Sequence, residues 1–477
     1  MNIQLSICKD YSLFPHQIIL IDDAVKFASL GLSKEDTAAA QKFFDEKVNH
    51  LFQLSSAGKT LSVVKIDTSK EEFKSLEAAR KAGNALNKFL NSQKIKEASL
   101  LNATAKAGLA AAFAEGIALS NYEFLKYKTK DKKEKSLAKL HVDTKSSDKN
   151  TLDEISKLVT ANFFSRTLIN EPLSYLTATQ LSKEIQKAGK EHGFSVEVFE
   201  KKKIEKLKMG GLLSVNKGSI DPPTFTVLEY KSGKKKNKKP IVLVGKGVVY
   251  DTGGLSLKPT PNSMDMMKCD MSGAAAVAGI FIAVAQLKLP IHIIGLIPAT
   301  DNRPGMNAYV PGDVVEMMSG LNVEMLNADA EGRMILADAL HYAKQYSPEL
   351  VFDFATLTGA AKAATGSVAS PFMGTASEEV KKKLLTSANN TYERLIEFPL
   401  WDEYGDMIKS DVADIKNVGG ADSGSITAGK FLECFTDYPW MHFDIAGTAY
   451  LMAEDSYRGK YGTAVGVRLI TDFLKNY

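Results

Sequence analysis

The chain has 477 residues, of which 44% are hydrophobic and 24% are charged, and its formal net charge is +4. These values are ordinary for globular proteins, so they exclude a wholly disordered chain or a collagen-like fibre, and so small a charge decides little about partners. The length exceeds what one hydrophobic core usually organises, so we expect two domains of unequal size.

The first twenty residues, the apolar runs and the cysteines indicate where in the cell the protein is located. Residues 1–20 have no basic start before an apolar stretch, and Lys9 and Asp10 interrupt them, so no secretory signal is expected. The longest apolar run, residues 273–285, is shorter than the ~20 residues a helix needs to cross a bilayer. The three cysteines form no C-x-x-C pair, which fits a reducing compartment and argues against a thiolate zinc site. We expect a soluble, cytoplasmic protein with no membrane partner.

The first third of the chain predicts a small α/β domain over residues 1–150. Apolar strands alternate with amphipathic helices: strands at 61–67 and 98–101, helices at 71–92 and 105–126. Residues 127–150 are polar and lysine-rich, so we expect the domain boundary there. A helix over 152–170, stopped by Pro172, predicts a connecting segment at 151–172.

The remainder, residues 173–477, predicts a second and larger domain. Apolar runs and amphipathic segments alternate again, with strands at 225–230, 241–250, 291–297 and 350–355, and helices at 273–286, 331–345 and 465–475. This alternation indicates an α/β fold with a mostly parallel central sheet flanked by helices, whose sites lie at the carboxyl ends of strands. The lysine-rich run 234–239 is expected to be a solvated connecting loop, with an acidic or nucleic-acid partner as the alternative.

Charged residues gather at the start of the predicted helix 331–345. Capping accounts for one polar residue there, because Asn327 or Asp329 can take the cap position. Glu331 gains a little stabilisation from the helix dipole, but Arg333 gains none. A well-capped surface helix is the alternative to a functional site, since acids are common in first turns.

A second polar cluster lies some eighty residues upstream and contains Lys246, Asp251, Lys258 and Asp270. Together with Asp329 and Glu331 it supplies four carboxylates, whose repulsion two divalent cations would offset. Hard oxygen ligands without a nearby histidine suit magnesium, manganese or zinc, so a two-metal hydrolytic site is the economical interpretation. A protonated lysine cannot bind a metal, so physics alone assigns Lys246 and Lys258 to stabilising a reacting oxyanion.

Other site types are disfavoured. The dinucleotide fingerprint beginning at Gly245 fails at Tyr250, and the G-x-x-x-x-G-K match at 424–430 continues with Phe431 where a Ser or Thr is needed. His292 and His442 lie in predicted strands and are expected to be satisfied core or edge residues. The serine-hydrolase motif G-x-S-x-G does not occur.

The segment Asn327-Ala328-Asp329-Ala330-Glu331-Gly332-Arg333 resembles the N-T-D-A-E-G-R signature of the leucyl (cytosol) aminopeptidases. Further blocks resemble that family in its order, and they span roughly residue 170 to the C-terminus: 244–247, 251–259, 264–271, 355–360 and 444–449. Several ordered blocks are far more specific than one motif.

The resemblance implies a dinuclear zinc or manganese aminopeptidase that releases N-terminal residues by attack of a metal-bridging hydroxide. By position, Lys246, Asp251, Asp270 and Glu331 would hold the tighter metal, with Lys246 as a neutral amine; Asp251, Asp329 and Glu331 would hold the exchangeable one. Lys258 would stabilise the oxyanion, and Arg333 would hold a bicarbonate that acts as general base.

The resemblance also implies a substrate pocket and an assembly. The pocket for the first side chain would be lined by small or apolar residues suited to leucine or methionine, namely Met267, Asn327, Thr356, Gly359, Ala446 and Ala449. The protein would act on peptides as a homohexamer. Two alternatives remain: a DNA-binding or assembly protein of the same family with a secondary peptidase role, and another two-metal hydrolase such as a phosphoesterase.

Three departures from the family pattern accompany the match. Ala328 replaces the threonine of the signature, one extra residue lies between Lys258 and Met264, and Cys269 stands where an aromatic residue is common. The loss of the threonine hydroxyl at Ala328 bears on metal affinity. The extra residue bears on whether Lys258 reaches the metals.

Overall fold

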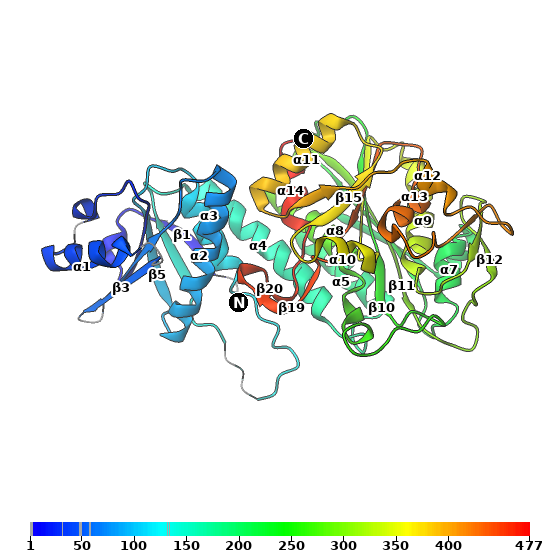
Figure 1. Cartoon of the computed structure of the whole chain (residues 1–477), viewed down its shortest axis with the longest axis horizontal. Coiled ribbons are helices and arrows are strands. Elements are labelled where there is room, and N and C mark those ends of the chain that lie inside the picture. Colours follow the sequence, from blue (N-terminus) through cyan, green and yellow to red (C-terminus); the bar gives the residue numbers. More distant parts are fainter. Residues whose placement is uncertain (1–2, 31, 47–49, 57–58, 131, 133) are drawn as a thin grey trace. The chain divides into compact units, whose positions relative to one another are not determined.

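A computed structural model describes residues 3–477 apart from 31, 47–49, 57–58, 131 and 133. The chain divides into two compact units (Figure 1). The N-terminal unit comprises Met1–Phe163 and Glu454–Gly459, and the C-terminal unit comprises Phe164–Ala453 and Lys460–Tyr477. The division falls within the helix α4 (Lys149–Asn170).

The N-terminal unit is built on a mixed sheet in which β3 is antiparallel to β4 and the other neighbouring strands are parallel. The strand order is β1-β6-β5-β2-β4-β3. The strands are β1 (Gln4–Cys8), β2 (His16–Ile21), β3 (Leu51–Ser56), β4 (Lys59–Lys65), β5 (Glu97–Asn102) and β6 (Lys139–Asp143). The predicted small α/β domain is thereby confirmed.

Helices cover both faces of this sheet because successive strand residues point to opposite sides. Ile18 and Leu20 of β2 pack in one core with α2 (Glu72–Ser92) and α3 (Leu109–Leu119). Ile19 and Ile21 pack in a separate cluster with α1 (Lys34–Asp45). Figure 1 shows α2 and α3 side by side on their face of the sheet.

Two predictions in this unit were wrong in detail. The segment 127–150 was expected to be a polar boundary, but it contains β6, whose Leu140 and Val142 are buried between β1 and β5. A five-residue strand beside lysine-rich sequence has too little periodicity to be recognised. The helix predicted over 105–126 is shorter, because α3 ends at Leu119.

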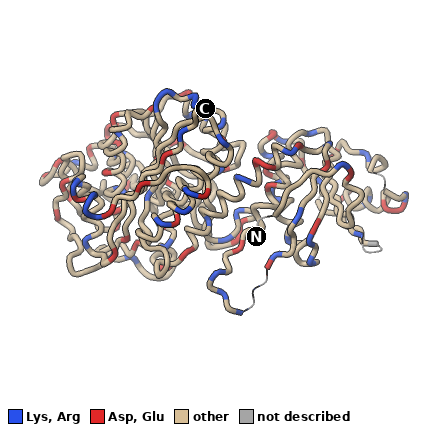
Figure 2. Tube along the Cα trace, turned by 180° about the vertical axis from the view of Figure 1, so that it is seen from behind, with Lys and Arg blue, Asp and Glu red and all other residues tan. Residues whose placement is uncertain are grey.

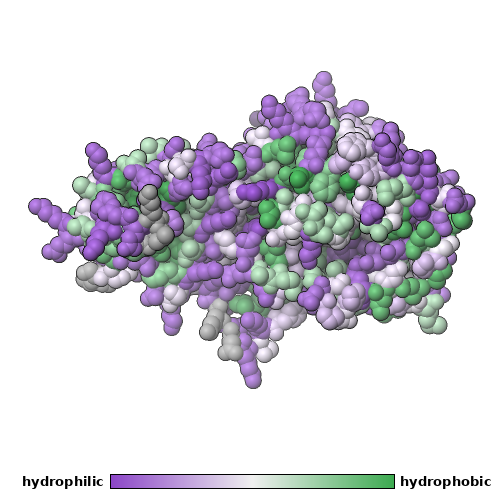
Figure 3. Space-filling model, viewed as in Figure 1, coloured by the Kyte–Doolittle hydropathy of each residue, from purple (hydrophilic) through white to green (hydrophobic). Residues whose placement is uncertain are grey.

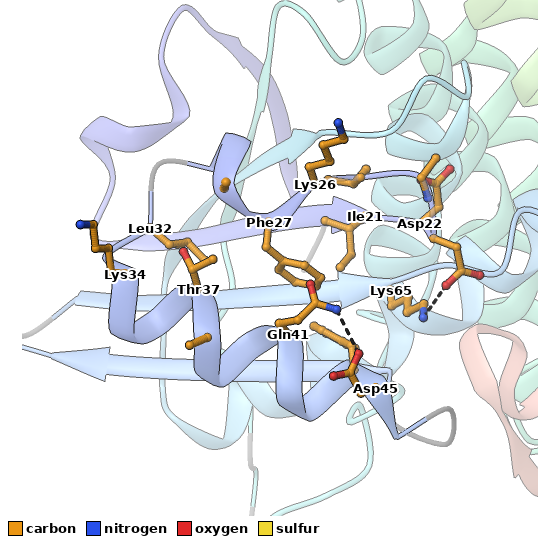
Figure 4. A pocket seen from close by; sticks show the side chains of 16 residues that line it. Ile21, Asp22, Lys26, Phe27, Leu32, Lys34, Thr37, Gln41, Asp45 and Lys65 are labelled. Atoms are coloured by element: carbon orange, nitrogen blue, oxygen red, sulfur yellow. Dashed lines mark hydrogen bonds and ion pairs between the residues drawn. The ribbon is translucent and has the colours of Figure 1, made fainter.

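A cavity of about 1010 Å³ lies in the N-terminal unit, beside α1 and the ends of β2 and β4 (Figure 4). Its lining is partly apolar, with Ile21 and Phe27. Lys65 and Asp23 in the lining form an ion pair of 2.6 Å, and Gln41 donates a hydrogen bond of 3.0 Å to Asp45. The polar groups are thus partly paired with one another.

The C-terminal unit is built on a larger mixed sheet whose central strands β18, β14, β9 and β11 are parallel. The path is β16-β15-β18-β14-β9-β11-β8-β7, and β10 pairs with β11. The strands are β7 (Ser195–Glu200), β8 (Thr224–Lys231), β9 (Ile241–Gly245), β10 (Gly247–Asp251), β11 (His292–Asn302), β14 (Leu350–Ala355), β15 (Ser370–Gly374), β16 (Leu395–Glu397) and β18 (Trp440–Asp444). The mostly parallel central sheet that we predicted is confirmed.

Smaller elements complete this unit, and the main helices lie on both faces of its sheet. Further strands are β12 (Asp313–Glu316), β13 (Asn322–Met325), β17 (Ile415–Lys416), β19 (Tyr450–Asp455) and β20 (Gly459–Gly462). The helices are α5 (Ala178–His192), α6 (Lys201–Lys206), α7 (Gly210–Asn216), α8 (Ser272–Leu287), α9 (Glu331–Ala343), α10 (Gly359–Thr365), α11 (Glu378–Thr391), α12 (Glu403–Asp406), α13 (Gly424–Glu433) and α14 (Val467–Lys475). Val242 and Val244 of β9 share a core with Ile335 of α9, whereas Phe352 of β14 packs on Phe473 of α14, with ring centroids 5.2 Å apart.

The helical stretch Met264–Leu287 is long and apolar enough, by length and composition, to cross a membrane. The apolar run 273–285 lies within this stretch, which is longer because it also includes the 3-10 turn Met264–Cys269 before α8. However, 89% of its apolar window is buried inside the protein, and it packs on β9 and β14. Such burial is typical of a core helix in an α/β fold.

Charges of both signs are interspersed over the chain (Figure 2). The lysine-rich run 234–239 forms the loop between β8 and β9, and its lysines are exposed, which confirms the predicted connecting loop. On the face seen in Figure 3, hydrophilic residues cover most of the surface and apolar patches lie on the C-terminal unit.

Candidate metal centre

The candidate residues lie where parallel strands end. Lys246 directly follows β9, Asp251 is the last residue of β10, and Thr356 follows β14. The carboxyl ends of parallel strands meet at one edge of the sheet, which is where α/β proteins place their sites. The predicted strand 241–250 is two strands because β9 pairs with β14 and β11, whereas β10 pairs only with a later part of β11. This break puts Lys246 and Asp251 on the same edge.

The start of α9 adds two acids to this edge. One oxygen from each of Asp251, Asp329 and Glu331 lies within 4.8 Å of the others. The helix has no side-chain cap at Ala330, and Asn327 instead accepts a hydrogen bond of 2.8 Å from the backbone N–H of Asp329. The acids of this segment are therefore not used as caps, in contrast to the surface-helix alternative.

Lys246 connects the fourth carboxylate, Asp270, to Glu331 through two ion pairs. Its Nζ lies 2.7 Å from Asp270 and 2.8 Å from Glu331, and it donates to the carbonyl oxygen of Thr356 at 3.0 Å. A Cβ at Gly332 would lie 2.5 Å from the Lys246 Cε, so a side chain at this position would push the Lys246 ammonium from its place between the acids.

Lys258 reaches the same centre despite the extra residue that follows it. Its Nζ lies 2.9 Å from the Asp251 carboxylate and also contacts Asp329. The turn between them depends on Gly253, which has a φ of +85° and donates its N–H to Asp251 at 2.8 Å. Gly247, in contrast, is needed for packing, because a Cβ there would meet the carbonyl oxygen of Pro298 on β11.

Burial and mutual repulsion dominate the electrostatics of this centre. Burial and the charges of Asp251 and Glu331 raise the pKa of Asp329 to about 7. Burial also raises the pKa of Asp270 well above its ordinary value, although Lys246 opposes this. Burial alone would lower the pKa of Lys246 and of Lys258, but the surrounding carboxylates raise both above the ordinary lysine value. The acids thus need more positive charge than the two lysines supply.

The residues fit divalent cations. The Glu331 Oε2 atom is buried and has no hydrogen-bond partner among the described residues, although its side chain is almost wholly enclosed. A buried carboxylate oxygen without a partner is costly unless it has a ligand. Carboxylate oxygens grouped at this spacing are suited to manganese, magnesium or zinc.

Arg333 lies two residues further along α9 and lines the same cleft. Its Nη1 donates to the carbonyl oxygen of Asn417 at 2.8 Å, while its buried Nε has no partner within the described part of the chain. Burial lowers the pKa of its guanidinium to about 10, against the charges of Glu331 and Asp444. Part of this buried guanidinium is therefore free to hold an anion.

Two asparagines that we did not single out from the sequence position the centre. Asn302 at the end of β11 donates to Asp251 at 2.8 Å and to the carbonyl oxygen of Ala328 at 2.9 Å. Asn417 accepts from the backbone of Leu326 at 2.9 Å and donates to the carbonyl oxygen of Asn327 at 2.8 Å. Asn302 holds the Asp251 side chain directly, and both asparagines hold the backbone of the ligand segment. Such contacts between residues distant in sequence leave no signature in a single sequence.

Ala328, which breaks the signature, is fully buried. Its N–H donates to the Ser256 hydroxyl at 3.0 Å, and its carbonyl oxygen accepts from Asn302. The hydrogen bonds that hold Ala328 in the centre are therefore made by its backbone and not by its side chain.

The centre opens into a cavity of about 310 Å³. Met267, Asn327, Thr356, Gly359 and Ala446 of the predicted substrate pocket line it. Ala449 is fully buried and lies outside the lining. The lining also contains Lys362 and Tyr450, which were not among the predicted site residues.

His292 and His442 are not among the residues that line this cleft. The Nε2 of His292 is 2.9 Å from Glu229, as expected of a satisfied edge residue. His442 is fully buried with its Nδ1 2.6 Å from Asp353, but its Nε2 has no hydrogen-bond partner among the described residues, so the prediction of a satisfied core residue holds only in part.

Comparisons with known proteins agree with this site. Residues 163–471 match the model of the cytosol aminopeptidase family, catalytic domain, and residues 51–131 match the N-terminal domain of the same family. The chain is 52% identical over 317 residues to a probable cytosol aminopeptidase of Chlorobaculum tepidum and 46% identical over 370 residues to one of Geobacter sulfurreducens. These alignments cover 66% and 76% of this chain and 62% and 74% of the respective relatives.

A solved structure is similar along nearly the whole chain. The bottromycin maturation enzyme BotP in complex with Mn superposes with a TM-score of 0.86 at 27% identity, covering 97% of this chain and 99% of that one. In three of the sequence relatives, including the one from Chlorobaculum tepidum, the aligned part spans less than two thirds of the relative's length.

Proposed function

Because the chain belongs to the cytosol aminopeptidase family, we propose that it is a metal-dependent aminopeptidase that releases apolar N-terminal residues, leucine above all, from peptides. The observation that carries this proposal is the group of Asp251, Asp329 and Glu331 at the strand ends, with Lys258 in contact with two of them. A cofactor of two zinc or manganese ions would offset the repulsion among these acids and Asp270.

The ligand assignment follows the contacts of each side chain. Asp251, Asp329 and Glu331 would hold one ion, the more exchangeable of the two. Lys246, Asp251, Asp270 and Glu331 would hold the other, since Lys246 contacts both Asp270 and Glu331. Lys246 would then give up its proton, which a nearby dication favours.

The bound ions would supply Lewis-acid polarisation of the scissile carbonyl and a water of lowered pKa. Lys258 would place its ammonium beside the carbonyl oxygen, where negative charge develops. Arg333, whose buried Nε has no partner among the described residues, would hold a bicarbonate that accepts the proton of the attacking water. Met267, Thr356, Gly359 and Ala446 would receive the first side chain, with Asn327 at the same cleft and Ala449 behind it.

We extend the proposal to location and assembly. A cytoplasmic homohexamer would cover some of the exposed apolar side chains of the C-terminal unit, such as Met306, Trp401 and Val412. Light scattering on the purified protein tests this, and a monomer at micromolar concentration contradicts it.

A nucleic-acid role is not proposed. The basic residues are interspersed with acidic ones, and the lysine-rich run is a loop between strands (Figure 2).

The test is hydrolysis of leucine p-nitroanilide by the manganese- or zinc-loaded protein. Asp329→Asn and Glu331→Gln should each reduce kcat/KM by at least roughly a hundredfold, because each removes a charge shared by the metals. Glu205→Gln on α6, an exposed acid, is the matched control and should retain activity. A metal-loaded wild type that is inert on leucine, methionine and cysteinyl-glycine substrates would exclude this function.

A further inference from the structure

Lys362 lines the cleft of the metal centre without a role in the proposed mechanism. It lies one turn after Gly359 on α10, and a Cβ at Gly447 would come within 3.4 Å of its Cα. The adjoining turn supplies Ala446 to the same cleft. Lys362 therefore stands among the residues proposed to receive the first side chain of a peptide.

Lys362 is exposed to solvent at the cleft, and its ammonium has no counterion among the described residues. No carboxylate of that part of the chain lies within ion-pair distance of it, and no described group accepts a hydrogen bond from it. The other two lysines of this cleft, Lys246 and Lys258, are each paired with two acids. A cation that faces a binding cleft without a partner is suited to an anion on the ligand.

Tyr450 supplies a second donor to the same cleft. Its ring is buried, it lines the same cleft, and its hydroxyl has no hydrogen-bond partner among the described residues. Lys362 and Tyr450 both line this one cavity of about 310 Å³, so both can reach a ligand bound in it.

We propose that Lys362 and Tyr450 form a carboxylate-binding end of the substrate cleft, so that the enzyme also removes N-terminal glutamate and aspartate. This inference rests on the proposed aminopeptidase function. A lysine side chain is long and flexible enough to meet a carboxylate without closing the apolar part of the pocket to leucine. The four acids of the metal centre do not repel such a substrate once two dications have neutralised them. A short peptide's own C-terminal carboxylate would offer the same chemistry, and the test separates the two sources.

The experiment compares the ratio of kcat/KM for glutamyl and leucyl aminomethylcoumarin substrates in the metal-loaded full chain. In Lys362→Met this ratio should fall at least about tenfold, because one charge-assisted hydrogen bond is lost. Tyr450→Phe should lower it less. In Lys362→Glu the preference should invert, so that a lysyl substrate is cut faster than a glutamyl one. Lys382→Met, an exposed lysine on α11, is the control and should leave the ratio unchanged.

A second arm uses Leu-Gly and Leu-Gly amide. If Lys362→Met slows Leu-Gly selectively, while the glutamyl ratio is unchanged, the bound carboxylate is the peptide's C-terminus. The inference is overturned if Lys362→Met and Lys362→Glu both leave the glutamyl-to-leucyl ratio unchanged and also leave the rate on Leu-Gly, relative to Leu-Gly amide, unchanged. Loss of leucyl activity in the wild type instead overturns the proposed function, so the two failures are distinguishable.

Discussion

At the scale of single residues, the acids at the start of α9 are explained by what they contact. Asp329 and Glu331 converge with Asp251, and the cap position is left to Ala330, which has no capping side chain. The free energy that a cap would add to the helix is forgone, typically about 1 kcal/mol. Packing of α9 in the core of the C-terminal unit offsets this, since most of its residues are buried.

Asn302 is expected to control metal affinity without touching a metal. It holds Asp251 and the backbone of Ala328 at once, so Asn302→Ala should leave Asp251 less well oriented and weaken metal binding roughly 10- to 100-fold. Equilibrium dialysis with manganese measures this. Asn322→Ala, an exposed asparagine on β13, is the control. Unchanged affinity in Asn302→Ala would contradict the orienting role.

At the scale of elements, α9 connects the centre to the rest of its unit. Glu331 and Arg333 face the cleft from its first turn, and Asp338 further along accepts hydrogen bonds of 2.9 Å from the backbone of Leu212 on α7 and of Met318 after β12. The same helix thus presents the site and fixes two neighbouring segments.

Asp338 should make the stability of this unit depend on pH. Burial raises its pKa to about 7, from an ordinary value of 3.8. Between these values the folded protein binds a proton that the unfolded chain has lost, so this stabilisation is complete below about pH 4 and is lost as the pH rises to about 7. Asp338→Asn cannot titrate, so the free energy of unfolding of the wild type relative to this variant should fall by a few kcal/mol across that window. Urea unfolding at several pH values measures it, and a constant difference would show that Asp338 does not titrate there.

Sequence patterns predicted the regular elements of this fold better than its connections. The strand β14 was predicted over the residues it occupies, because an apolar run in a parallel sheet is easily recognised. The break between β9 and β10 was missed, since both halves are apolar and only their different partners separate them.

The same contrast holds for the site. The carboxylates and Lys258 were predicted and do come together, whereas Asn302, Asn417 and Lys362 were not singled out. Their roles depend on neighbours distant in sequence, and an isolated polar residue carries no pattern.

At the scale of the whole molecule, metal binding should contribute to stability as well as to catalysis. Four buried or half-buried carboxylates repel one another, and Asp270 and Asp329 both have raised pKa values. Ions that bind only the folded state stabilise it by RT ln(1 + [L]/Kd), where [L] is the free ion concentration. This is about 3 kcal/mol when [L] is a hundred times Kd.

Chelation should therefore lower the melting temperature, and manganese or zinc should restore it. Differential scanning fluorimetry with and without chelator measures this. The variant Glu331→Gln should show a smaller shift than the wild type, and Glu205→Gln an equal one. A wild-type melting temperature that chelator does not change would show that the folded chain holds no such ion.

The short segment Glu454–Gly459 belongs to the N-terminal unit although it comes late in the chain. Tyr457 packs in that unit's core and donates a buried hydrogen bond of 2.8 Å to Glu77, 380 residues earlier. During synthesis the ribosome must therefore release most of the C-terminal unit before the first unit receives its last core residue. Closing so long a loop is slow. The emerging N-terminal unit would thus spend most of translation as an incomplete intermediate, which makes it a natural client for chaperones.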